Sequence, residues 1–210
     1  MMRFLSACCA LQLVACSHPS PTLYVPPELA PISRLAVTGR EDWISGTKPL
    51  HFGEYTLARR GSFGFRLTAT GRGSWVGDCA PITTERQGPP PIVVASDLRC
   101  TLDPGSGDTS RTWRLVVRTL KGEVPRGDLV GPNARVDVLG ANQVQGGSAP
   151  GGALPAGYHI LAAGRAVAAV DPLGEGAVWL DTGLAAERRD AIAAAAAALL
   201  LWNDLVNPRK

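Results

Sequence analysis

One run near the C-terminus restricts the possible folds more than any other feature of the sequence. Residues 191–202 read Ala-Ile, six alanines, three leucines and Trp, with no charged or amide side chain. We expect a helix over 185–205, capped by Asp181 or Thr182 and ended by Pro208. A helix that is apolar on every side has to be buried on every side. At ~1.5 Å per residue the run spans ~18 Å, too short to cross a bilayer. The helix must therefore lie within a β-structure or against a partner.

The chain from residue 35 to about residue 180 has the alternation that is typical of strands. Residues 63–69 place Phe, Phe, Leu and Ala at every second position, and residues 113–118 place Trp, Leu and Val in the same way. This period of two predicts antiparallel strands with one wet face. Further strands are expected at 52–59, 74–79, 92–100, 135–138, 158–162, 165–171 and 177–181.

The fold class that follows is mainly β, an antiparallel barrel or sandwich with a buried hydrophobic C-terminal helix. Three short strands within 158–181 followed by the apolar helix resemble the end of the tubby and phospholipid-scramblase fold. That resemblance implies a closed antiparallel barrel threaded by the terminal helix, and a lipid-binding role through basic surface residues. The alternative is a β-sandwich with the helix lying across one open face.

The N-terminus has the pattern of an export signal. Arg3 is followed by an apolar stretch over 4–14, interrupted only by Ser6 and Gln12. This stretch is too short to span a bilayer and suits the apolar region of a signal peptide. Residues 13–16 (Leu-Val-Ala-Cys) resemble the lipobox of bacterial lipoproteins, which implies that Cys16 is lipidated and becomes the mature N-terminus. The alternatives are a plain secretory signal or a buried N-terminal strand.

The predicted domain organisation follows from that signal. Residues 1–15 are the lipoprotein signal peptide, 16–34 a lipidated Pro-rich tether, and 35–210 a single β-rich domain. The tether contains five prolines within 17–34, and in polyproline II form it would reach ~50 Å. By resemblance to enterobacterial sorting, Ser17 after the lipidated cysteine favours the outer membrane. The predicted location is therefore the bacterial cell envelope, with the chain held by N-terminal acyl chains.

Two cysteines remain in the domain once the signal has been removed and Cys16 acylated. Cys79 and Cys100 form an even pair in an oxidising compartment, which predicts a disulfide between them. Such a bridge would close a loop of ~20 residues and contribute ~3 kcal/mol in the loop-entropy model. The alternative, a redox or metal pair, lacks both a CxxC spacing and a nearby histidine.

No motif in the sequence indicates catalysis, a metal or a cofactor. The domain has two histidines, His51 and His159, and no Gly-x-Ser-x-Gly elbow. We expect His159 to point to solvent, because it alternates with two apolar neighbours. A formal net charge of +3 does not favour nucleic-acid binding. Candidate surface groups are two tryptophans beside loops, for an exposed binding surface, and five arginines, for an anionic-lipid patch: Trp43, Trp75, Arg59, Arg60, Arg72, Arg188 and Arg189.

These observations favour a membrane-tethered, non-enzymatic binding or structural module, with an envelope protein or a lipid as partner. Two alternatives stay open. One is a lipid-binding tubby-like module, which as a carrier would need an apolar cavity beside the helix. The other is an envelope hydrolase whose site is assembled from scattered residues such as His159, Asp171 and a serine.

Overall fold

A computed structural model describes residues 22–44, 48–86, 92–120, 123–148 and 155–206. Strands dominate, joined by two α-helices, α1 (Arg40–Ile44) and α2 (Ala186–Val206), and two short 3-10 helices, η1 (Pro27–Leu29) and η2 (Thr109–Arg111). The strands are β1 (Leu35–Thr38), β2 (Leu50–Phe52), β3 (Tyr55–Arg60), β4 (Gly64–Ala69), β5 (Gly73–Arg86), β6 (Ile92–Asp103), β7 (Trp113–Leu120), β8 (Arg126–Gly131), β9 (Ala134–Ala141), β10 (Gln143–Val144), β11 (Gly147–Ser148), β12 (Gly157–Ala162), β13 (Arg165–Asp171) and β14 (Ala177–Leu180).

Twelve of the strands form a closed antiparallel barrel in the order β1-β14-β13-β12-β9-β8-β7-β6-β5-β4-β3-β2. The short strand β1 closes it, because Leu35 pairs with Val178 of β14 while Val37 pairs with Phe52 of β2. β10 and β11 form a separate small hairpin outside the barrel. The predicted β-barrel with a C-terminal helix is confirmed, and the alternative of an open sandwich is wrong.

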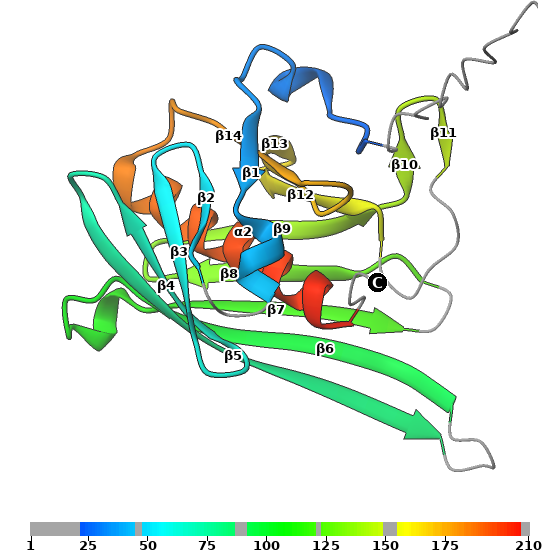
Figure 1. The fold of residues 1–210 in the computed structure, drawn as a ribbon, viewed down its shortest axis with the longest axis horizontal. Coiled ribbons are helices and arrows are strands. Elements are labelled where there is room, and N and C mark those ends of the chain that lie inside the picture. The colour runs from blue at the N-terminus through cyan, green and yellow to red at the C-terminus, as the bar shows by residue number, and fades with distance from the viewer. Residues whose placement is uncertain (1–21, 45–47, 87–91, 121–122, 149–154, 207–210) are drawn as a thin grey trace, which may run out of the picture.

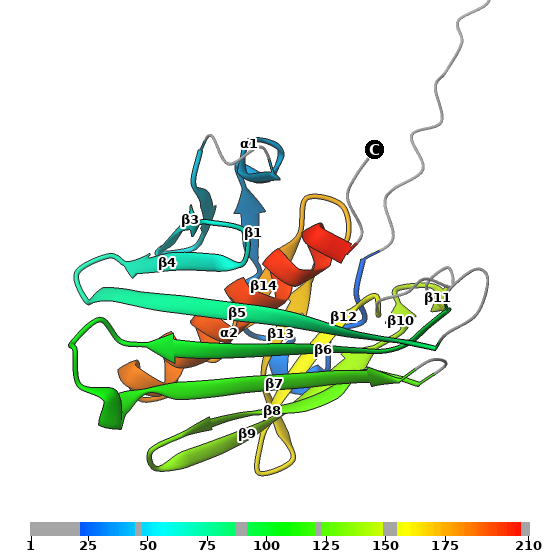
Figure 2. The ribbon, with the colours of Figure 1, turned by 90° about the horizontal axis from the view of Figure 1, so that it is seen from below.

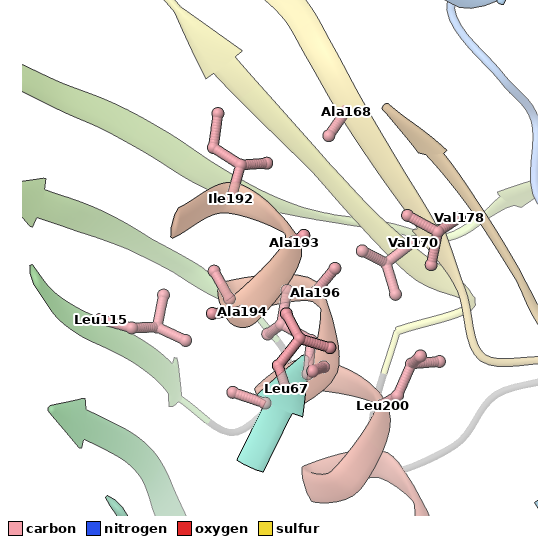
Figure 3. Close-up of a cluster of buried hydrophobic side chains, with 14 of the residues drawn as sticks. Leu67, Leu115, Ala168, Val170, Val178, Ile192, Ala193, Ala194, Ala196 and Leu200 are labelled. Atoms are coloured by element: carbon pink, nitrogen blue, oxygen red, sulfur yellow. The ribbon is translucent and has the colours of Figure 1, made fainter. Parts of the chain in front are cut away.

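Helix α2 runs through the middle of the barrel (Figures 1 and 2). The predicted bounds of 185–205 differ from the observed helix by one residue at each end. Every residue from Ala191 to Trp202 is at most 2% exposed, because strands surround the helix on all sides. Figure 3 shows Ile192, Ala194 and Leu200 among inward side chains that come from several strands. The alanines keep the helix thin, so that the barrel can close around it at interior packing density.

The inner faces of the strands supply the other half of this core. Trp113, Leu115 and Val117 of β7 are at most 3% exposed, while Arg114 and Arg118, which alternate with them, face outward. The same alternation holds in β4, where Phe65 and Leu67 point inward. The period of two in the sequence therefore marks the inner and outer faces of the barrel.

The N-terminal segment 22–34 packs against the outside of the barrel, and its assignment to an extended tether is wrong. Leu23 and Leu29 are fully buried and belong to a second apolar cluster with Ala169, Ala177 and Trp179. Leu23 also forms a β-bridge with Val144 of β10. Proline content indicated an extended backbone, but it carried no information on where two leucines would dock. A free tether downstream of Cys16 could thus span only 16–21.

Strands β13 and β14 are buried on both faces as a result. All residues of β13 after Arg165 and all four of β14 are buried, because α2 covers the inner face and segment 22–34 the outer one. The nearly continuous apolar sequence of these two strands fits this arrangement, because segment 22–34 adds a third layer on this side of the barrel.

The hairpin of β5 and β6 extends past its neighbour on one side. β4 pairs with β5 only as far as Gly64 opposite Asp78, whereas β5 and β6 stay paired out to Arg86 and Ile92. Cys79 and Cys100 lie directly opposite each other where the overhang begins, with their Cα atoms 4.0 Å apart, and form the predicted disulfide. The bridge therefore joins the two strands where β5 loses its other neighbour. The proline run at 89–91 lies outside the described residues.

Candidate functional site

The polar side chains that the fold buries gather at the two open ends of the barrel. We call the end where α2 begins the N-terminal mouth and the end where α2 stops the C-terminal mouth. Asp190 directly precedes the apolar run and Asp204 lies two residues after it. Both carboxylates are buried, at 6% and 5% exposed, so each one needs a partner from the barrel wall.

At the N-terminal mouth, Arg72 joins two carboxylates. Its guanidinium donates to both oxygens of Glu54 at 2.7 and 2.9 Å and to both oxygens of Asp190 at 2.8 and 3.1 Å. The hydroxyl of Tyr55 donates to Asp190 at 2.8 Å, and the Arg72 guanidinium lies 5.7 Å from the centre of the Tyr55 ring. β3, β5 and α2 are tied together here by a network that is shared among four side chains.

The electrostatics of this network keep the Glu54 carboxylate and the Arg72 guanidinium charged and the Tyr55 hydroxyl neutral. The hydrogen bond from Arg72 holds the pKa of the Glu54 carboxyl below its ordinary value. Its hydrogen bonds to Glu54 and Asp190 raise the pKa of Arg72, so the guanidinium stays charged. Burial, and then the hydrogen bond to Asp190, raise the pKa of Tyr55. The arrangement is suited to holding the β2–β3 and β4–β5 turns on the helix, because the pKa shifts of Glu54, Tyr55 and Arg72 all move these groups away from proton exchange near neutral pH.

Two surface hollows flank the network. One, of about 290 Å³, is lined by Leu35, Glu54, Leu180 and Arg189, with part of segment 31–33. The other, of about 360 Å³, lies against Arg72, Trp75, Arg111 and Glu187. The arginines around the two hollows all form ion pairs. Arg72 pairs with Glu54 and Asp190, Arg111 with Glu187 at 3.1 Å, and Arg189 with Glu54 at 3.8 Å. The hollows therefore offer no unpaired arginine that would single out an anionic ligand.

At the C-terminal mouth, one ion pair is fully enclosed. Arg40 of α1 donates to Asp204 from Nη2 at 2.6 Å and from Nε at 3.1 Å, with side chains 1% and 4% exposed. Its Nη1 donates to the carbonyl of Pro172 at 2.8 Å. This pair closes the end of the helix core and ties α1 to α2. Sequence reasoning missed Arg40, which no local pattern distinguishes from the other arginines.

The two groups proposed for a hydrolase do not pair. Asp171 accepts from the backbone N–H of Leu23 at 2.9 Å and of Leu173 at 2.8 Å, and burial raises the pKa of its carboxyl. His159 Nε2 lies 3.0 Å from the carbonyl of Tyr24 and donates to it, and burial lowers the pKa of the imidazole. His159 points outward, and segment 22–34 covers part of it, so its side chain is half-buried and not fully exposed to solvent. Both groups serve to hold that segment in place.

The tryptophans proposed for a binding surface lie in the core. Trp43 is 1% exposed and Trp75 is 5% exposed, because α1 turns Trp43 onto the barrel and β5 points Trp75 inward. The proposed arginine patch does not assemble either, since Arg72 and Arg189 join the network on Glu54 while Arg59 donates to the carbonyl of Gly61. Proximity to a loop was thus a poor guide to exposure.

Two of the buried polar atoms inside the barrel belong to a stacked pair of aromatic rings. The Tyr158 hydroxyl and the Trp202 indole N–H have no hydrogen-bond partner among the described residues. Their rings stack with centroids 6.4 Å apart, and neither residue lines one of the hollows described above. They are part of the aromatic packing at the end of α2.

Over the described parts of the chain, no three His, Cys, Asp or Glu side chains are grouped closely enough to hold a metal ion. Within the same residues, no helix combines the length and apolarity needed to span a membrane. Cys16 lies outside the described residues. Comparison of the chain with protein-family models, curated proteins and solved structures finds no match in any of the three.

Proposed function

We propose that this protein is a lipid-anchored lipoprotein of the bacterial cell envelope, at the outer membrane, whose barrel is a non-enzymatic binding or structural module. The acyl chains on Cys16 would hold the mature N-terminus in the membrane. The barrel would act through its outer surface on an envelope protein or a lipid.

The observation that carries this proposal is the filling of the barrel by its own helix. The twelve residues from Ala191 to Trp202 occupy the interior, and all are at most 2% exposed. Inward side chains of the surrounding strands form one buried cluster with them, and Figure 3 shows several of these side chains. An interior filled in this way leaves no room for a small-molecule substrate or an acyl chain, so recognition has to take place outside.

The path of the N-terminal segment supports the anchor. Residues 23 and 29 are buried on the barrel wall, and the backbone at Thr22 accepts a hydrogen bond from Gln145 at 2.8 Å. Six residues, 16–21, then separate a lipid on Cys16 from the folded domain, a reach of ~19 Å when extended at ~3.1 Å each. The barrel would therefore lie close to the membrane surface instead of hanging far from it.

A lipid-reading module related to the tubby and scramblase families is the second candidate. The closed barrel with a central apolar helix favours it, because the resemblance in the last strands implied that architecture. Lipid would then be read on the outer surface, since a carrier needs an internal cavity and the helix occupies that space.

The anchor is tested by intact mass spectrometry of the protein from its native host, together with membrane fractionation. We expect a mature N-terminus at Cys16 carrying acyl chains, and loss of processing in Cys16→Ser. Cys8→Ser is the matched control, because it changes a cysteine of the signal that the proposal leaves unmodified. An unmodified Cys16, or an N-terminus elsewhere, would falsify the anchor. A pull-down and lipid-overlay screen that recovers neither a partner nor a lipid would count against the binding role.

A further inference from the structure

The exposed apolar side chains of the barrel gather at one end. Large hydrophobic residues that are more than a third exposed number six among the described residues. Five of them lie at the C-terminal mouth and form what we call the apolar rim: Tyr24 (45%), Ile82 (41%), Leu120 (51%), Val124 (39%) and Val206 (38%). The sixth, Val130, pairs with Arg114 near the N-terminal mouth.

Separate elements bring the rim together. Ile82 lies on the overhanging part of β5, Leu120 ends β7 and Val206 ends α2. Both views place the ends of β5–β6, the β10–β11 hairpin and the end of α2 on the same side of the molecule (Figures 1 and 2). Because β5 continues past Cys79 without β4 beside it, Ile82 stands clear of the barrel wall.

The N-terminal segment enters at this same end. The backbone N–H of Tyr24 donates to the carbonyl of Gln143, and the backbone N–H of Gln145 donates to the carbonyl of Thr22. The described chain therefore begins beside the β10–β11 hairpin. A lipid on Cys16 would be six residues upstream. The proposed anchor thus draws the C-terminal mouth, and not the opposite one, towards the bilayer.

A second feature at this mouth points to an anionic surface. Arg118 of β7 pairs directly with Arg126 of β8, and both side chains are exposed on the outer face. Like charges opposite each other on neighbouring strands are unfavourable unless an anion lies between them. Asp97 approaches Arg118 only to 3.9 Å, and Asp128, two residues after Arg126 on β8, pairs with Arg135 at 3.6 Å. The two guanidiniums are suited to lipid phosphates.

From these features we infer that the C-terminal mouth docks on the surface of an anionic phospholipid bilayer, with the apolar rim in the interface and Arg118 and Arg126 on headgroup phosphates. The inference rests on the proposed lipid anchor. It adds a second membrane contact to the acyl chains, which would fix the orientation of the barrel on the bilayer. The partner of the apolar rim is then lipid and not a protein.

The test uses the full chain reconstituted into vesicles of phosphatidylethanolamine and phosphatidylglycerol that contain a doxyl-lipid quencher. An environment-sensitive fluorophore is placed on Leu120→Cys, and on Val130→Cys as the matched control at the opposite mouth. The signal of the parent chain without an introduced cysteine is subtracted. We expect several-fold stronger quenching at position 120 than at position 130. Equal quenching at both positions overturns the inference. Absence of quenching at position 120, which is the result if a protein and not lipid covers the rim, also overturns it.

Charge substitutions test the anionic part. Arg118→Gln with Arg126→Gln should abolish the dependence of quenching at position 120 on phosphatidylglycerol. Arg135→Gln, which removes an exposed arginine at the other end of the sheet, should leave that dependence unchanged. An unaltered dependence in the double variant would remove the arginines from the docking surface.

Mass spectrometry of the same preparations separates this inference from the anchor. Acylated protein with no preference for position 120 overturns the docking and leaves the anchor intact. Unacylated protein that still quenches at position 120 supports the docking and overturns the anchor. Near-ultraviolet circular dichroism of each variant checks that the barrel is folded.

Discussion

The two mouths of the barrel solve the same electrostatic problem in different ways. Each has an acidic residue of α2 that must be paired, Asp190 at one end and Asp204 at the other. At the C-terminal mouth Arg40, whose side chain is 1% exposed, forms a buried ion pair with Asp204. At the N-terminal mouth Arg72 is 23% exposed and divides its donors between Asp190 and the more exposed Glu54.

This difference teaches that an ion pair is costly to break only where water cannot replace the missing partner. Arg40 without Asp204 would be left as a buried charge, which is strongly unfavourable. Arg72 without one carboxylate would keep the other and would also be hydrated. Four substitutions test this contrast, and their expected losses of stability fall from the enclosed positions to the exposed one.

A carboxylate placed between the two mouths should have the largest effect. Ala195→Asp puts a charge on a residue that is 0% exposed and surrounded by apolar side chains, where several kcal/mol are lost for want of a partner. We expect the domain to unfold, as measured by circular dichroism and thermal melting. A melting temperature near that of the wild type would show that the helix is not enclosed.

Removal of the enclosed acid at the C-terminal mouth comes next. Asp204→Ala should destabilise the domain by about 3–5 kcal/mol, because Arg40 is left buried and charged. Urea unfolding measures the loss. The double variant Arg40→Met with Asp204→Leu is the control and should recover most of the stability. Equal losses in the single and double variants would mean that the damage is steric and not electrostatic.

The corresponding change at the N-terminal mouth should cost less. Asp190→Ala leaves Arg72 paired with Glu54 but deprives the buried Tyr55 hydroxyl of its acceptor, at about 1–3 kcal/mol. Adding Tyr55→Phe removes that orphaned hydroxyl and should restore part of the loss. If Asp190→Ala proved as damaging as Asp204→Ala in the same urea titration, the two mouths would not differ as proposed.

The smallest effect should come from the exposed carboxylate. Glu54→Gln should cost under ~1 kcal/mol, because the Glu54 side chain is 41% exposed and solvent screens the pair. Arg72 lowers the pKa of Glu54 in the folded state. The contribution of this carboxylate is therefore present above its ordinary value of 4.5 and is lost as the pH falls through the lower folded value. The stability difference between wild type and variant should vanish in acid, and a difference independent of pH would contradict the electrostatic account.

The elements of the fold were largely predictable from local patterns. The alternation at 113–118 and at 63–69 marked two strands and their inner faces, and the apolar run at 191–202 marked a helix that had to be enclosed. Two domain cysteines in an export context indicated the disulfide between Cys79 and Cys100. Each of these inferences depends on neighbours in sequence or on composition, which is why no tertiary information was needed.

The polar contacts of the mouths were not predictable in the same way. Arg72 was grouped with other arginines as a surface patch, but the turn between β4 and β5 places it on Asp190, which is distant in sequence. Asp190 and Asp204 flank the apolar run. A carboxylate at the end of a buried helix requires a partner, but the sequence does not show which residue that partner is. The docking of Leu23 and Leu29 was missed for the same reason, since a proline-rich composition describes the backbone and not the surface on which it lies.

By itself, the sequence determined that the thin apolar helix had to be buried on every side, within a β-structure or against a partner, because its side chains have no other way to leave water. Only the tertiary structure decided that the strands close into a barrel, which arginine meets which carboxylate, and which exposed apolar residues share one end. These features depend on contacts between residues far apart in the chain, and the local periodicity of the sequence does not encode such contacts.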